Sequence, residues 1–290
     1  MSAAARTTLF AHRGASADFH EHTRAAYLEA IRQGADGLET DVRLTADGHL
    51  VCWHDPTTDR VAGVPGWVHR LTLDELRALD VTRGQAIPAE YGTAAEQVMT
   101  LPELLALIAE ADRPVRLALE IKQPGPFAGA LDDEVLQTLA DAGWDASSGR
   151  LGDSTVDLMC FWPQTAASLL ETVSPSLVML LVEDAEHDEL VRWVEHETGG
   201  VLSGDSAERA VADAQTTRDE LLDDARVGVG PDRAIVKRDP QLMRSWTQSG
   251  RAVRVWTVDD IADALLCLDV GVTELTTNRP KRLRGDLERY

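Results

Sequence analysis

Residues 37–55 read GLETDVRLTADGHLVCWHD and contain the pattern that decides the fold. Glu39 and Asp41 stand two residues apart in a β-rich run, so their carboxylates lie on the same face of one strand. Only Thr45–Gly48 separates this run from a second apolar run, His49–Trp53. So short a connection containing Asp-Gly predicts a hairpin, whose second strand runs antiparallel to the first. The hairpin would return His54 to about the height of Asp41.

Further β-rich runs alternate with helical patterns on both sides of this stretch. The expected parallel strands are Leu9–His12, Gly37–Val42, Leu117–Lys122, Val156–Phe161, Leu177–Val182, Arg226–Gly230, Ala252–Thr257 and Val272–Thr277. Eight β-then-α units predict an α/β fold, the (β/α)8 TIM barrel. The hairpin follows strand 2, and a small insertion, about residues 56–99, precedes strand 3. We expect residues 1–290 to form a single domain.

Helix boundaries support the same division. Residues suited to capping a helix N-terminus precede four helical patterns: Thr23, Thr72, Thr100 and Asp239. Glu stands three residues after Thr72 and after Thr100, which is the spacing of a capping box. The acidic stretch 205–226 is expected to be a solvated helix.

Composition limits the partners. The formal net charge is −21, which disfavours nucleic acid because its phosphates would be repelled. No run approaches the roughly 20 apolar residues of a membrane span, and residues 1–8 lack the apolar core of a signal peptide. A cytoplasmic protein is therefore expected. The three cysteines are far apart and are expected to be buried apolar residues.

Polar residues collect where the predicted strands end. In a barrel of this kind, active sites lie at the carboxyl ends of the strands. Three carboxylates, Glu39, Asp41 and Glu120, would repel one another there unless a cation neutralised them. Carboxylate oxygens suit a hard divalent metal, Mg²⁺ or Ca²⁺, with Mn²⁺ as a further choice.

The remaining polar residues suggest phosphoryl chemistry. His12 ends the first strand and His54 returns on the hairpin, so the pair could serve as general acid and base. Arg13 and Lys122 are cations suited to holding a phosphate. Taken singly, these residues have structural alternatives: the acids could pair in a salt network with Arg43 or Lys122, and His12 could be a core histidine. The histidines at 20, 22, 49 and 69 are interpreted as surface or loop residues.

The motifs in this order resemble those of the glycerophosphodiester phosphodiesterases. The matching stretches are Ala11–Ser16, Glu21–Thr23, Gly34–Val42, Thr45–Gly48, Trp53–Pro56, Asp59–Arg60, Thr100–Leu104, Leu119–Lys122, Val255–Val258 and Thr277–Pro280. They extend over nearly the whole chain, and the N-terminal block is the most specific.

The resemblance implies metal-dependent hydrolysis of glycerophosphodiesters to sn-glycerol 3-phosphate and an alcohol, with a glycerophosphodiester as the small-molecule partner. It implies that the three carboxylates bind the metal, that His12 and His54 transfer protons, and that Arg13 and Lys122 hold the phosphate. Phe161 and Trp256 are expected on the glycerol or alcohol side, although buried barrel aromatics are the alternative.

Three departures from the family pattern are visible: His20 and His22 flank Glu21 where Pro and Asn are frequent, Asn278 stands where Asp is usual, and Cys160 precedes Phe161 where Ser is common. None removes a proposed ligand or catalytic histidine. Two other functions stay open, namely a phosphodiesterase of the same fold acting on phospholipids, and a non-catalytic barrel that binds a phosphorylated ligand. Residues 56–99 either shape the alcohol pocket or only cover the barrel edge.

Overall fold

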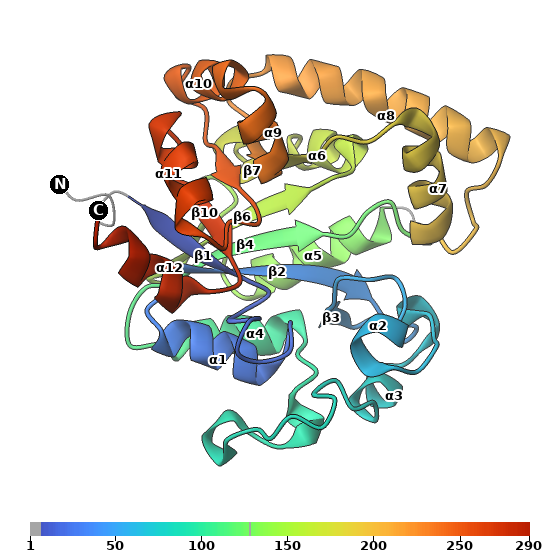
Figure 1. Ribbon diagram of the computed structural model, residues 1–290. Coiled ribbons are helices and arrows are strands. Elements are labelled where there is room, and N and C mark those ends of the chain that lie inside the picture. Colours follow the sequence, from blue (N-terminus) through green and yellow to red (C-terminus); the bar gives the residue numbers. More distant parts are fainter. Residues whose placement is uncertain (1–6, 128) are drawn as a thin grey trace.

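The computed structural model describes residues 7–127 and 129–290. Within these residues, eight strands run parallel and alternate with helices, so the predicted barrel is confirmed (Figure 1). In chain order the parallel strands are β1 (Thr8–His12), β2 (Gly37–Leu44), β4 (Arg116–Ile121), β6 (Ser154–Cys160), β7 (Val178–Val182), β8 (Gly228–Pro231), β9 (Arg254–Val255) and β10 (Glu274–Thr277).

The strands pair in the order β8-β7-β6-β4-β2-β1-β10-β9. Two isolated parallel bridges, Val229 to Val253 and Asp232 to Trp256, join β8 to the β9 segment and nearly close the barrel. β9 is shorter than the predicted strand 252–257, because only Arg254 and Val255 pair with β10 while the residues beside them face β8.

The predicted hairpin is present. β3 (Leu50–Cys52) pairs antiparallel with the end of β2, with Val42 opposite Cys52 and Leu44 opposite Leu50. A second short antiparallel strand, β5 (Arg150–Leu151), precedes β6. The hairpin extends β2 beyond the barrel, and the chain then enters residues 56–99.

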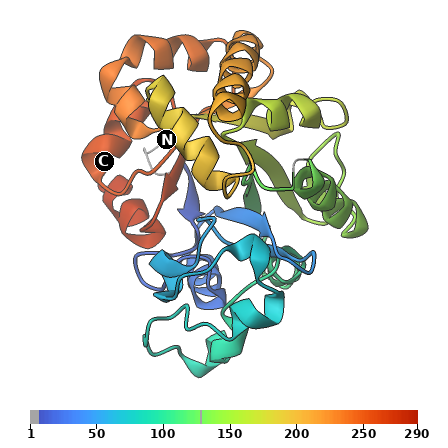
Figure 2. The same ribbon diagram turned by 90° about the vertical axis from the view of Figure 1, so that its right-hand side faces the viewer.

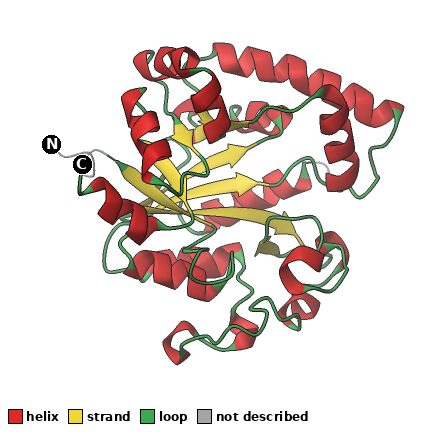
Figure 3. Ribbon diagram, in the orientation of Figure 1, coloured by secondary structure: helices red, strands yellow, loops and turns green. Residues whose placement is uncertain are grey.

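Helices surround the strands, as the colouring by secondary structure makes clear (Figure 3). They are α1 (Arg24–Arg32), α2 (Asp59–Ala62), α3 (Leu73–Arg77), α4 (Leu101–Ala109), α5 (Ala130–Asp141), α6 (Pro163–Leu169), α7 (His187–Glu197), α8 (Asp205–Asp223), α9 (Arg233–Arg238), α10 (Pro240–Gln248), α11 (Ile261–Asp269) and α12 (Pro280–Leu287). The 3-10 turns are η2 (Val68–Arg70), η3 (Ala89–Tyr91), η4 (Ala94–Glu96) and η5 (Pro175–Leu177).

The four predicted N-caps all occur. The side chains of Thr23, Thr72, Thr100 and Asp239 accept hydrogen bonds from the first turns of α1, α3, α4 and α10. Both expected capping boxes are complete. No helix in the described part of the chain is long and apolar enough to cross a membrane.

The barrel core is mainly aliphatic, but one charged group is enclosed within it. Arg254 is 2% exposed, and its guanidinium lies 3.8 Å from the ring centroid of Phe10. It donates to Asp157 at 2.8 Å and to Glu274 at 2.9 Å. The charge is therefore paired on both sides, as a buried guanidinium requires.

The turn after β1 requires glycine at position 14. Gly14 has a φ of 84°, and a Cβ there would lie 2.6 Å from the backbone carbon of Ala26 in α1. Gly34, at the end of α1, has a similar φ of 76° but open space around it.

We predict that Gly14→Ala lowers the free energy of unfolding by about 3 kcal/mol, because left-handed strain and overpacking add. Gly34→Ala meets only the strain and should cost about 1 kcal/mol. Urea unfolding of the two variants measures the difference. Equal losses would contradict the close approach of the turn to α1.

Candidate active site

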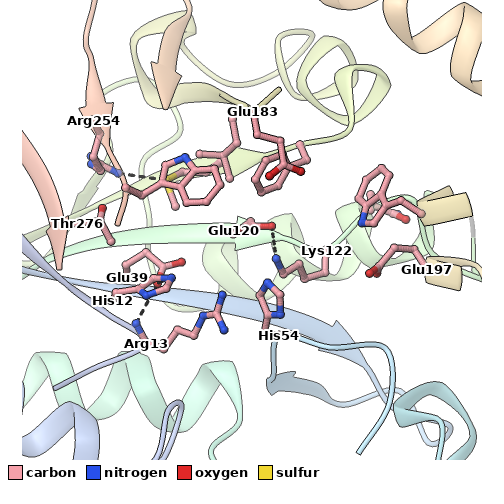
Figure 4. Close-up of a pocket in the computed structure, with 16 residues that line it drawn as sticks. His12, Arg13, Glu39, His54, Glu120, Lys122, Glu183, Glu197, Arg254 and Thr276 are labelled. Atoms are coloured by element: carbon pink, nitrogen blue, oxygen red, sulfur yellow. Dashed lines mark hydrogen bonds and ion pairs between the residues drawn. The ribbon is translucent and has the colours of Figure 1, made fainter. Parts of the chain in front are cut away.

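A pocket of about 320 Å³ lies at the carboxyl ends of the strands (Figure 4). Its lining includes eight of the nine predicted site residues: His12, Arg13, Glu39, His54, Glu120, Lys122, Phe161 and Trp256. The ninth, Asp41, is 1% exposed. Its Oδ1 lies 3.0 Å from Lys122 Nζ, at the wall of the pocket. Figure 2 views the barrel from the side at which the strands end, with α7 (yellow) in front of them.

The three carboxylates form a compact, buried cluster. Strand register places Asp41 directly beside Glu120, and Glu39 precedes Asp41 by two residues on the same face. One oxygen from each of the three lies within 4.8 Å of the others. These three residues are called the acidic cradle below.

Burial and mutual repulsion act strongly on the cradle. Burial and the neighbouring Asp41 raise the pKa of Glu39 well above its usual range. Burial also raises the pKa of Glu120, to about 8, despite the opposing effect of Lys122. Burial alone would raise the pKa of Asp41, but Lys122, His54 and Arg13 hold it well below its usual range.

The cradle fits a hard divalent cation. Lys122 Nζ lies 2.6 Å from Glu120 Oε1 and 3.0 Å from Asp41 Oδ1, and Arg13 Nε lies 3.2 Å from Asp41 Oδ2. When all three carboxylates are ionised, as metal binding requires, these two cations leave one negative charge unbalanced among them. A divalent cation together with a singly charged phosphodiester would neutralise this set of charges, and oxygen donors are the ligands that Mg²⁺, Ca²⁺ and Mn²⁺ prefer.

Each candidate histidine is held through Nδ1. Asn278 donates its Nδ2–H to Asp259 at 2.6 Å, so its Oδ1 faces His12 and accepts the Nδ1–H at 2.8 Å. His54 donates its Nδ1–H to Asp55 Oδ1 at 2.6 Å. No hydrogen bond joins either Nε2 to another described residue.

Both imidazoles are neutral near neutral pH. Burial and the charge of Arg13 lower the pKa of His12 to about 4. Burial and Lys122 lower the pKa of His54 to about 3. Each ring therefore offers an unprotonated Nε2.

A salt-bridge network joins the loop after β1 to the loop after β3. Arg13 Nη1 donates to Glu21 at 3.0 Å. Arg60 donates to Glu21 at 2.7 and 2.8 Å and to Asp55 at 2.5 Å. Arg60 thereby supports the residue that orients His54. Glu21 and Arg60 both belong to motifs that the sequence singled out, but nothing in the sequence indicated that they pair with each other.

His22 was interpreted as a surface or loop residue; it lies in the loop before α1, but it is buried there and not at the surface. His22 is 5% exposed, and its Nε2 lies 2.8 Å from Asp41 Oδ2 while its Nδ1 lies 2.7 Å from Tyr27 Oη. Left-handed backbone at Arg13 and Gly14, with φ values of 57° and 84°, folds the loop back over the strand ends. The only local sequence feature that could have indicated this burial is that His22 directly precedes the cap residue Thr23.

The other half of the pocket is apolar. Phe161 and Trp256 meet edge to face at 5.5 Å between ring centroids, and Trp256 Nε1 donates to the carbonyl of Gly230 at 2.7 Å. The lining residues that sequence reasoning missed include Glu183 after β7, and Trp193 and Glu197 on α7. α7 reads as an ordinary polar helix, so nothing in its sequence indicated that it crosses the mouth.

Residues 56–99 do not line this pocket within the described chain. They affect the pocket indirectly, because Arg60 donates to Asp55, which orients His54. The roof of the pocket is instead α7, which contributes Trp193 and Glu197. Arg43 of β2 fixes that roof, because it donates to Glu197 at 2.6 Å and to the backbone carbonyl of His54 at 2.7 Å. This arrangement favours the covering role for residues 56–99 over a role in shaping the alcohol pocket.

Comparison with known proteins gives a consistent picture. The sequence model of the Glycerophosphoryl diester phosphodiesterase family matches residues 12–282. A Mycobacterium tuberculosis protein named "Probable glycerophosphodiester phosphodiesterase 1" is 32% identical over 279 residues, covering 96% of this chain and 91% of that one. A glycerophosphodiester phosphodiesterase of Caldanaerobacter subterraneus is 36% identical over 140 residues, covering 48% of this chain and 55% of that one.

Solved structures share the fold. A phosphodiesterase of Oleispira antarctica, in complex with the product sn-glycerol-3-phosphate, superposes with a TM-score of 0.69 at 21% identity, covering 99% of this chain and 100% of that one. A glycerophosphodiester phosphodiesterase of Thermotoga maritima gives a TM-score of 0.63 at 19% identity, covering 95% and 96% of the two chains.

We predict that Mg²⁺, Mn²⁺ or Ca²⁺ raises the melting temperature by about 5 °C at a concentration 100 times its Kd, since a ligand of the folded state alone stabilises it. Glu120→Gln should remove most of this shift by taking a charged oxygen ligand from the cradle. Asp132→Asn is the matched control, because Asp132 is a buried carboxylate bonded to Gln123 and Thr165 outside the cradle. Thermal melts with and without metal measure both; a full shift in Glu120→Gln would contradict the cradle.

Proposed function

This chain belongs to the glycerophosphoryl diester phosphodiesterase family and is a phosphoric diester hydrolase; on that premise we propose that it cleaves glycerophosphodiesters into sn-glycerol 3-phosphate and an alcohol, using a divalent metal and two histidines. One observation carries the proposal. The acidic cradle, two unprotonated imidazoles and two cations line the same pocket.

Glu39, Asp41 and Glu120 would hold the metal. The bound metal would supply positive charge beside a phosphate oxygen, which favours the transition state of phosphoryl transfer. Arg13 and Lys122 bind the phosphate next to it. Both cations are already held by carboxylates, so little side-chain entropy is lost when substrate binds. The roof formed by α7 limits the water that can reach the phosphate.

His12 and His54 move protons at Nε2. One imidazole takes the proton of the attacking hydroxyl. The other must first take up a proton at Nε2, which the negative charge of the bound phosphodiester favours, and it then delivers this proton to the oxygen of the leaving alcohol. The 2-hydroxyl of the glycerol is a suitable nucleophile, which would form a cyclic phosphate that water then opens. The hydrogen bonds at Nδ1 to Asn278 and Asp55 keep each ring oriented for this transfer.

The decisive assay is hydrolysis of a panel of glycerophosphodiesters, with release of sn-glycerol 3-phosphate measured before and after rigorous chelation. We expect turnover with metal and its loss without it. Full activity after chelation would refute the metal requirement. Turnover of phospholipid vesicles but not of glycerophosphocholine would support the phospholipid-directed alternative, and ligand binding without any turnover would support a non-catalytic barrel.

We predict that His54→Ala lowers kcat by at least about 100-fold, since proton transfer by a positioned side chain contributes that much or more. The metal-induced rise in melting temperature should remain, because His54 is not part of the cradle. His49→Ala is the control, since His49 is an exposed hairpin residue beside Asp47. Loss of the metal shift in His54→Ala would make His54 a ligand instead.

A substrate with a p-nitrophenol leaving group separates the acid from the base. This alcohol leaves without being protonated, so removal of the acid should cost little on such a substrate while removal of the base still costs the full factor. We predict that one of His12→Ala and His54→Ala recovers on glycerophospho-p-nitrophenol and the other does not. Recovery of both, or of neither, would contradict the division of roles.

A further inference from the structure

The pocket has two chemically different halves. The cradle, the histidines and the two cations occupy the side formed by β1, β2, β4 and the hairpin. The opposite side is formed by apolar and aromatic residues of β6, β7 and the β9 segment, with Trp193 above them. A phosphodiester bound at the polar side would direct one of its two esterified groups toward this aromatic side.

A second, apolar cavity of about 70 Å³ adjoins the aromatic side. It shares Phe161, Leu181, Glu183 and Trp193 with the catalytic pocket. Its remaining lining is mainly apolar and includes residues of α6, α7 and α8. Trp162 lies on this side, with its ring centroid 6.3 Å from that of Trp193. The two cavities therefore meet at a junction that has aromatic rings on its walls.

Glu183 is the charged group of the junction. It follows β7 directly, and no described residue donates a hydrogen bond to it or forms an ion pair with it. Although its side chain reaches solvent, partial enclosure and the carboxylates of Asp232, Asp184 and Glu189 raise its pKa, with Lys122 opposing them. The surroundings of Glu183 are thus negative. Glu197, the other acid of the roof, is already paired with Arg43.

We propose that the junction formed by Phe161, Trp193 and Glu183 binds a positively charged ammonium group on the leaving alcohol. Aromatic faces attract cations through their ring quadrupole, and a carboxylate without a partner adds a direct attraction. The proposal rests on the proposed function, because it names the class of alcohol released: amino alcohols, including those with a quaternary ammonium. Glycerol and its phosphate carry no positive charge, so the alcohol is the part of the substrate that this junction can select.

Arg218 of α8 is the cation in the lining of the second cavity. It would favour an alcohol that carries a carboxylate. The ammonium site is therefore distinguished from an arginine site by the charge of the alcohol that the enzyme prefers.

Binding of free alcohols tests the junction without requiring catalysis. Choline and 3,3-dimethyl-1-butanol have the same shape and differ in the positive charge. We expect titration calorimetry to give choline at least about fivefold tighter binding, the factor that a partly enclosed cation–π contact supplies. Equal binding of the two compounds would overturn the proposal.

Variants connect this binding to turnover. Glu183→Gln and Trp193→Leu should each lower the ratio of kcat/KM for glycerophosphocholine to that for glycerophosphoglycerol by about fivefold to tenfold. Trp193→Phe should restore most of the ratio, since it keeps an aromatic face. Asp188→Asn is the matched control: it removes the same charge from an exposed position on α7 outside both cavities, and the ratio should stay constant.

Three results would overturn the proposal. An unchanged ratio of kcat/KM values in Glu183→Gln would mean that this carboxylate does not bind the ammonium group. Equal losses of kcat/KM on both substrates in Trp193→Leu would mean that Trp193 has a structural role only. Preference for glycerophosphoserine that Arg218→Ala abolishes would move recognition to the arginine. Failure of the proposed function is distinguishable, because choline would then still bind more tightly than its uncharged analogue while no diester was hydrolysed.

Discussion

The buried carboxylate of Asp41 is the constraint on which the site depends. It is 1% exposed, and three basic groups surround it: Lys122 Nζ at 3.0 Å, Arg13 Nε at 3.2 Å and His22 Nε2 at 2.8 Å. They come from β4, from the turn after β1 and from the residue before the α1 cap. Removing one partner from such a buried cluster costs several kcal/mol, so these segments stay together once the barrel closes. The polar half of the pocket is thereby preorganised before any ligand binds.

Strands and loops contribute in different ways. The strands place the cradle, since their register and alternation leave little freedom. The end of β1 places His12 and the loop after β3 places His54, and both rings need further support: Asn278 for His12, and Asp55 with Arg60 for His54. Arg43 connects the segment after β3 to the helix that covers the pocket, because it donates to the backbone carbonyl of His54 and to Glu197 of α7. Residues 56–99 thus contribute to the site through Arg60, at a distance from the substrate.

Sequence reasoning succeeded for interactions between residues close together in the sequence and failed for those between distant residues. The hairpin, the helix caps and the shared face of Glu39 and Asp41 follow from spacings of two to four residues, and all are present. The burial of His22 was missed because its partner Asp41 lies 19 residues away in the sequence, and no local spacing relates the two. Trp193 gave no signal, since a polar helix has the same pattern whether it lies over solvent or over a pocket. Glu183 directly follows the predicted strand Leu177–Val182, so its place at a strand end was a signal that sequence reasoning did not use. The cytoplasmic location and the identity of the metal stay predictions.

By itself, the sequence determined the class of fold and which polar side chains lie near the strand ends, including those proposed to bind metal, transfer protons and hold phosphate. These depend on alternation along a strand and on the rule that parallel strands end at one edge. Only the tertiary structure decided which neutral or charged partner each histidine has, which carboxylates are buried, and which helix covers the mouth. Those properties arise from contacts between segments far apart in the chain, where burial changes the charge of a carboxyl or an imidazole and no local pattern records it.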